Sequence, residues 1–122
     1  MIRRIASGGP YEDVIGYSRA VRAGPFVLVS GCTSIVDGAY EQTLAAFGVA
    51  ERALIEVGLA RADVVRTRMY VTDIALWEEV GRAHGELFAA VRPAATMVAV
   101  TALIDPRMRV EIEVDAYDER SP

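Results

Sequence analysis

The 122-residue sequence contains one cysteine, one histidine and no long hydrophobic run. A lone cysteine, Cys32, excludes an intrachain disulfide and a zinc site built from several cysteines. The only histidine, His84, has no His, Cys or Asp cluster at ligand spacing around it, so we expect no metal and no cofactor. The glycines at Gly8, Gly9 and Gly16 follow neither a phosphate-loop nor a dinucleotide pattern.

Charge and hydropathy exclude further classes of protein. The net charge of −4 argues against a broad phosphate-binding face, so nucleic acid is not an expected partner. No stretch approaches the ~20 apolar residues of a membrane span, and no apolar segment follows the N-terminal arginines as in a secretory signal. The composition, 52% hydrophobic and 25% charged, is typical of a globular chain. We therefore expect a single domain over residues 1–122, a cytoplasmic location and no membrane partner.

Hydrophobic periodicity predicts an α+β fold in the order β, β-β, α, β, α, β, β. The expected strands are residues 2–6, 18–23, 26–32, 64–72, 96–102 and 110–117. The first expected helix covers residues 39–57 and ends at Gly58. The second begins after Asp73 as N-cap and ends before Pro93. Its apolar stripe is predicted to pack in the core and comprises Trp77, Val80, Leu87, Phe88 and Val91.

Two strands alternate cleanly between apolar and polar residues. One face of residues 64–72 carries Val65, Thr67, Met69 and Val71, and the other carries Arg66, Arg68 and Tyr70. The strand at 110–117 has a polar face of Glu111, Glu113, Asp115 and Tyr117. Two helices can cover only one face of this mixed sheet, so we expect the polar, aromatic-bearing face to contact another subunit.

Four stretches occur in an order that resembles the RidA (YjgF) family, covering residues 15–117. They are "GYSRAVRAGPFVLVSG", "VVRTRMYVTD", "RPAATMVAV" and "VEIEVDAY". The resemblance implies a chorismate-mutase-like fold that assembles as a homotrimer. Three sheets would then form a central barrel with helices outside, and small-molecule clefts would lie between neighbouring subunits.

In the deaminating members of that family, small imines and enamines derived from amino acids are hydrolysed to keto acids and ammonia. Their motif is a proline, a small residue and an arginine whose guanidinium binds the substrate carboxylate, a task suited to its planar fork. Here Pro93 and Ala94 match the motif, but Ala95 occupies the arginine position. Met97 stands where these members commonly have cysteine. The sequence therefore resembles a branch that lacks the substrate-carboxylate arginine.

Other positions match the family's cleft more closely. Glu111 matches the residue thought to position or activate the hydrolytic water, although an ion pair with a neighbouring arginine is an equal alternative. Tyr17, Ser30 and Gly31 match cleft-lining positions. Ser30 has no evident base partner, so serine nucleophile chemistry is not supported.

Another arginine of the chain could bind the substrate carboxylate in place of the missing one. Arg68 is the first candidate because it lies on the polar side of its strand, and a structural salt bridge across the trimer is the competing interpretation. Arg19 and Arg92 are weaker candidates. Cys32 is interpreted as a small residue beside the cleft and not as a nucleophile, since it lacks a nearby base.

Three functions follow from these features. The first is a small-molecule hydrolase of the imine or enamine type whose substrate lacks a free carboxylate or holds it differently. The second is a non-catalytic ligand-binding or regulatory trimer that keeps the cleft without the chemistry. Endoribonuclease activity is the weakest hypothesis, because the chain is acidic and has no basic, aromatic stripe.

Overall fold

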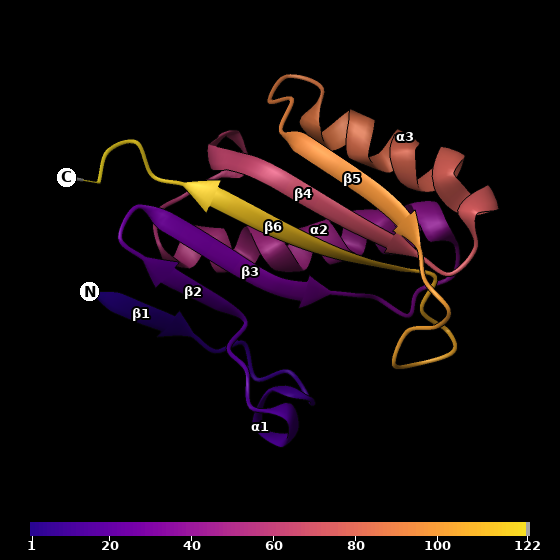
Figure 1. The fold of residues 1–122 in the computed structure, drawn as a ribbon, viewed down its shortest axis with the longest axis horizontal. Helices are drawn as coiled ribbons and strands as arrows, with labels where there is room; N and C mark the ends of the chain where they lie inside the picture. Colours follow the sequence, from indigo (N-terminus) through magenta and orange to yellow (C-terminus); the bar gives the residue numbers. More distant parts are fainter. Residues whose placement is uncertain (122) are drawn as a thin grey trace.

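The computed structural model describes residues 1–121, which form a six-stranded sheet with two long helices on one face (Figure 1). The strands are β1 (Ile2–Ile5), β2 (Ala20–Ala23), β3 (Phe26–Cys32), β4 (Val64–Val71), β5 (Ala94–Ala99) and β6 (Val110–Tyr117). The helices are α1 (Glu12–Ile15), α2 (Ala39–Glu56) and α3 (Trp77–Phe88), with 3-10 turns η1 (Arg61–Asp63) and η2 (Ile74–Leu76). Of the helices in this part of the chain, none has the length and apolar character needed to cross a bilayer.

The sheet is mixed, as predicted. Its strand order is β1-β2-β3-β6-β4-β5, and every neighbouring pair is antiparallel except β4 and β5. The parallel pair is joined by a crossover through α3, because parallel strands cannot be connected by a tight turn. In Figure 1, α2 runs behind the strands and the short α1 lies apart, near the N-terminal strands. The predicted α+β fold with two helices on one face is confirmed.

The core lies between the sheet and the two long helices. Alternate residues of β6 point into it and are fully buried, namely Val110, Ile112, Val114 and Ala116. Phe47 of α2 meets Phe88 of α3 edge to face, with ring centroids 5.1 Å apart. Each such buried apolar side chain stabilises the fold by about 1.5–3 kcal/mol. His84 joins this cluster, and its Nε2 is 2.8 Å from Oγ1 of Thr67.

Three details of the prediction were wrong. A register shift between Val64 and Arg66 adds a residue to β4, so Val64 is buried while Val65 is 46% exposed. Trp77 is 55% exposed, because it is the first residue of α3 and precedes the first buried turn. The fifth strand covers Ala94–Ala99 instead of residues 96–102, because its parallel pairing with β4 starts directly after the proline and ends opposite Val71.

The face of the sheet away from the helices carries polar and aromatic side chains. Phe26 and Tyr117 pack edge to face with ring centroids 5.2 Å apart. Nη1 of Arg68 is 3.2 Å from Oδ2 of Asp115. Leu28, also on this face, is 48% exposed. The predicted polar, aromatic-bearing face is therefore present and has no cover within residues 1–121.

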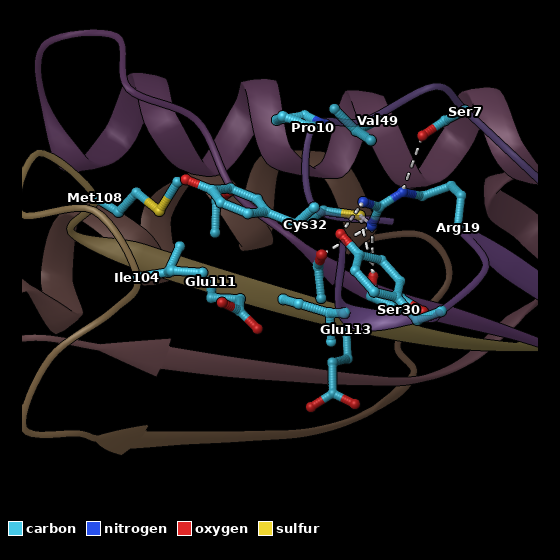
Figure 2. Close-up of a pocket in the computed structure, with 16 residues that line it drawn as sticks. Ser7, Pro10, Arg19, Ser30, Cys32, Val49, Ile104, Met108, Glu111 and Glu113 are labelled. Atoms are coloured by element: carbon cyan, nitrogen blue, oxygen red, sulfur yellow. Dashed lines mark hydrogen bonds between the residues drawn. The ribbon is translucent and has the colours of Figure 1, made fainter. Parts of the chain in front are cut away.

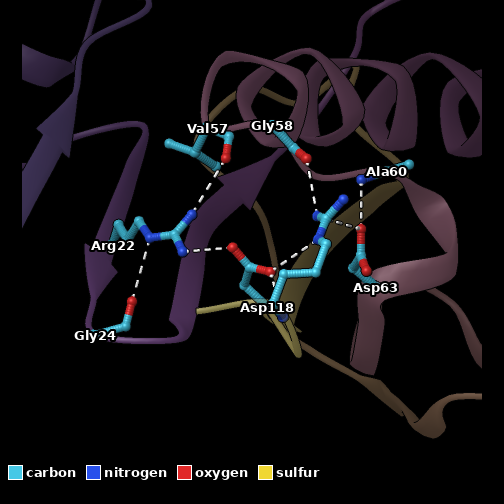
Figure 3. Close-up of polar contacts among 8 residues, drawn as sticks. Arg22, Gly24, Val57, Gly58, Ala60, Asp63 and Asp118 are labelled. Carbon is cyan, nitrogen blue, oxygen red and sulfur yellow. Dashed lines mark hydrogen bonds and ion pairs between the residues drawn. The ribbon is translucent and has the colours of Figure 1, made fainter. Parts of the chain in front are cut away.

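An ionic network fastens the C-terminal segment to the end of α2 (Figure 3). Arg22 donates to the Asp118 carboxylate at 2.6 Å and to the Val57 carbonyl at 3.2 Å. Arg120 donates to Asp118 at 3.1 Å and to the Gly58 carbonyl at 3.0 Å. Gly58 ends α2 in the left-handed region, with φ of 78°. These bonds connect β2, α2 and the residues after β6, which are distant in sequence.

Candidate functional site

A cavity of about 730 Å³ lies where the loop before α1, the end of β3 and the start of β6 meet (Figure 2). It contains four of the predicted site residues, Tyr17, Ser30, Gly31 and Glu111. Its apolar wall includes Ile15, Val49, Ile104 and Met108. This volume and this mixture of apolar wall and few polar groups are typical of small-molecule sites.

A β-bulge shapes the wall of the cavity. The register of β3 against β6 shifts between Val29 and Cys32, so Ser30 and Gly31 leave the regular ladder. The Ser30 backbone N–H donates to the Arg19 carbonyl at 2.9 Å, and its Oγ donates to the Ser18 carbonyl at 2.7 Å. The hydroxyl of Ser30 is thus used to hold the bulge.

Gly31 makes room for Glu111. A Cβ on Gly31 would overlap Oε2 of Glu111 and lie only 2.8 Å from its carboxyl carbon. Because such a contact is essentially forbidden, the carboxylate can occupy its position only beside a glycine. The bulge and Gly31 therefore leave the space in which the Glu111 carboxylate lies.

The Glu111 carboxylate is half-buried, and its pKa is raised above the usual value. Burial is the main cause, and the negative charge of Glu113 adds to it, while Arg19 acts in the opposite direction. Within the described chain Glu111 forms no ion pair, and Arg68 pairs with Asp115 instead. A carboxylate of this kind is suited to accept and return a proton.

The buried side chain of Arg19 hydrogen-bonds to the backbone of the bulge. It is only 7% exposed, and its Nη1 donates to the carbonyls of Ser30 at 3.2 Å and Gly31 at 2.8 Å (Figure 2). The same nitrogen is 3.3 Å from Sγ of Cys32. Sequence reasoning gave Arg19 little weight, and the available signal was a charged residue at the start of an apolar hairpin strand.

Cys32 is buried at the edge of the cavity. Burial raises the pKa of its thiol to about 11, although Arg19 lowers it in part. The thiol is thus protonated at neutral pH, which favours the interpretation of Cys32 as a small wall residue.

The remaining predicted site residues lie outside this cavity. Arg68 is on the open face of the sheet, bonded to Asp115. Ala95 and Met97 are on the edge strand β5, which is separated from β6 by β4. A ligand-binding role for these three remains a prediction that requires a second copy of the chain.

Metal chemistry has no evident site in residues 1–121. No group of three or more His, Cys, Asp or Glu side chains is placed there to hold an ion. His84 lies in the helix-packed core beside Thr67, and burial lowers its pKa.

Comparisons with known proteins agree with this geometry. A family model described as "Endoribonuclease L-PSP" matches residues 10–118. The solved structure of Rv2704 from Mycobacterium tuberculosis, described as a member of the YjgF/YER057c/UK114 family, superposes with a TM-score of 0.93. It is 50% identical and covers 96% of this chain and 99% of that one. This chain belongs to the YjgF family. The predicted RidA (YjgF) membership is confirmed.

Two further relatives also cover most of the chain. An uncharacterized protein from Streptomyces coelicolor is 43% identical, over 95% of this chain and 92% of the relative. A RutC family protein from Aquifex aeolicus is 33% identical, over 82% of this chain and 86% of the relative. The family is thus supported by both sequence and fold.

Proposed function

We propose that this YjgF-family protein hydrolyses small imine- or enamine-bearing metabolites in the cavity beside Glu111. One observation carries the proposal. The half-buried Glu111 carboxylate, with its raised pKa, lies against Gly31 at the wall of a cavity of small-molecule size. A raised pKa makes this carboxylate a better proton acceptor than an exposed glutamate.

In the proposed reaction of an imine, Glu111 accepts a proton from water as the water oxygen bonds to the imine carbon. The imine nitrogen takes up a proton from solvent, which yields a carbinolamine. The carbon–nitrogen bond then breaks as Glu111 returns its proton to the nitrogen, which leaves as ammonia. The hydroxyl oxygen releases its proton to solvent and forms the carbonyl. The balance is one imine and one water to one carbonyl compound and one ammonia. Tyr17, which lines the same cavity, is proposed to hydrogen-bond the ligand through its hydroxyl.

The proposed assembly is a homotrimer with the open sheet face inside. The exposed side chains of Phe26, Leu28 and Tyr117 on that face support it, because apolar surface of this extent favours a partner. In such an assembly, Ala95 and Met97 on the edge strand would face the cavity of a neighbouring subunit, as the family resemblance implies. The cleft would then combine Glu111 of one copy with β5 of another.

A non-catalytic ligand-binding trimer is the second candidate. It is favoured by Ala95, which leaves the cleft without the arginine that deaminating members use. The family description names an endoribonuclease, but the net charge of −4 and the apolar cavity wall favour a small ligand over RNA.

Ammonia release distinguishes these candidates. An amino acid oxidase generates a panel of 2-imino acids in situ, and ammonia is followed with and without the protein. We expect the protein to accelerate the hydrolysis of some imines over the spontaneous rate. No acceleration for any of them would favour the non-catalytic candidate.

A further inference from the structure

Arg19 is a buried cation without a carboxylate partner. Its side chain lines the cavity and the residue is 7% exposed. The ion pairs in residues 1–121 involve Arg22, Arg61, Arg68, Arg82, Arg107 and Arg120, and none involves Arg19. Buried charges are costly and are usually paired or bound to a ligand. The cavity wall therefore contains a positive group that lies over the Tyr17 ring, 5.6 Å from its centroid, and has no carboxylate of residues 1–121 in direct contact.

Arg19 lowers the pKa of two nearby acids, Glu12 and Glu111, but in the described part of the chain neither carboxylate forms an ion pair with it. The Glu12 carboxylate accepts bonds from the Ser7 backbone at 3.1 Å, the Ser7 hydroxyl at 2.5 Å and the Gly9 backbone at 2.7 Å. These three donors hold the loop before α1. The Glu111 carboxylate lies against Gly31.

The guanidinium of Arg19 has an under-used edge. Its Nη1 contacts two carbonyls and Sγ of Cys32, whereas Nη2 has only a long contact, 3.5 Å, with Oη of Tyr17. Nε has a similar 3.5 Å contact with Oγ of Ser7. A bidentate acceptor of opposite charge would satisfy this edge far better than two long neutral contacts.

We propose that Arg19 binds the carboxylate of the natural ligand, with the Tyr17 hydroxyl beside it. The inference rests on the proposed small-molecule cavity and specifies the ligand class as a small organic acid. The apolar wall of Ile15, Ile104 and Met108 receives the body of that acid. The anion is thus held from the Glu111 side of the cavity, by an arginine on a different strand from Ala95.

Matched acids and amides test this assignment by equilibrium binding. The probes are 2-oxobutyrate and phenylacetate, each compared with its neutral amide by calorimetry. We expect wild type to bind at least one acid about tenfold or more tightly than its amide. Arg19→Gln should weaken the binding of the acid by about tenfold to a hundredfold, because one charge-assisted contact is lost. The affinity for the amide should stay unchanged. Arg19→Lys should retain part of the preference.

Two further variants test the other arginines considered as anchors for the carboxylate. Arg68→Gln removes the rival anchor on the open face, and Arg92→Gln removes an exposed arginine. Both should keep the acid preference. The proposal is overturned if wild type binds neither acid more tightly than its amide, if Arg19→Gln weakens acid and amide equally, or if Arg68→Gln alone removes the preference.

Because Arg19 also supports the bulge, Arg19→Gln has a risk of misfolding. The Arg19 Nε–H resonance of wild type, assigned with Arg19→Lys, gives a second test. It should shift on addition of the acid and not of the amide, and an unchanged resonance at saturation with acid would overturn the proposal. A protein that prefers acids but releases no ammonia would contradict the proposed catalysis alone.

Discussion

The Glu111 carboxylate occupies the space that a side chain at Gly31 would need. The two residues come from different strands, and the bulge between Val29 and Cys32 brings them together. The proposed proton acceptor, Glu111, can therefore lie here only because Gly31 has no side chain. This relationship links the backbone geometry of β3 to the chemistry of the cavity.

Gly31→Ala should displace the Glu111 carboxylate and lower imine hydrolysis by about a hundredfold, the usual scale of general base catalysis. Steady-state ammonia release measures this. Gly85→Ala is the matched control, because Gly85 lies in α3 with open space around it. It should keep full activity and gain up to about 1 kcal/mol of stability. Equal activity of both variants would show that the Gly31–Glu111 contact does not matter.

A separate prediction concerns Ala95 on the edge strand β5. With Ala95 in place of an arginine, turnover of 2-iminopropionate-type substrates should be weak. Ala95→Arg should strengthen the binding of small 2-oxo acids, since it adds a second guanidinium to the cleft of the neighbouring subunit. Calorimetry with pyruvate measures the change. Unchanged affinity would mean that β5 does not face the ligand.

Leu28→Asp should convert a homotrimer into a monomer, because it places a charge on the open sheet face. Light scattering at micromolar concentration measures the mass. The control is Ile55→Asp, which puts the same charge on the exposed side of α2 and should leave the trimer intact. A wild-type chain that is monomeric under these conditions would contradict the proposed assembly.

The network at the C-terminal segment predicts a dependence of stability on pH. The pKa of Asp118 is lowered from 3.8 to about 2, chiefly by the hydrogen bond from Arg22. Because the folded pKa lies below the unfolded one, the stabilisation is present above about pH 4 and is lost as pH falls toward 2. Asp118→Asn should therefore be less stable than wild type in urea at pH 7, with a smaller difference at pH 3. Asp37→Asn, on an exposed turn, should show no such change. An equal difference at both pH values for Asp118→Asn would contradict this account.

The sequence predicted the elements that follow from periodicity. The alternation in Val110–Tyr117 and the helical spacing in Ala39–Glu56 each reflect one buried face, and the structure confirms both. The site was only partly predictable. The family resemblance supplied Glu111 and Gly31, but their contact depends on a bulge, which has no periodic signal.

Burial of single polar residues was equally hard to foresee. Arg19 is buried because three acceptors around the bulge converge on Nη1, an arrangement that only the folded backbone creates. Trp77 is exposed although its spacing fits the core stripe, since periodicity does not show where a helix first meets the sheet. The bulge at Val65 shifted one residue to the opposite face for the same reason.

Glu111→Gln tests the central claim most directly, because it removes the proton acceptor while keeping the size and shape of the side chain. The measurement is ammonia release from in situ 2-imino acids, with Glu86→Gln on the exposed surface of α3 as the matched control. We predict that Glu111→Gln lowers the catalysed rate by about a hundredfold or more while Glu86→Gln retains it. A Glu111→Gln variant that hydrolyses imines as fast as wild type would contradict the proposed role of Glu111.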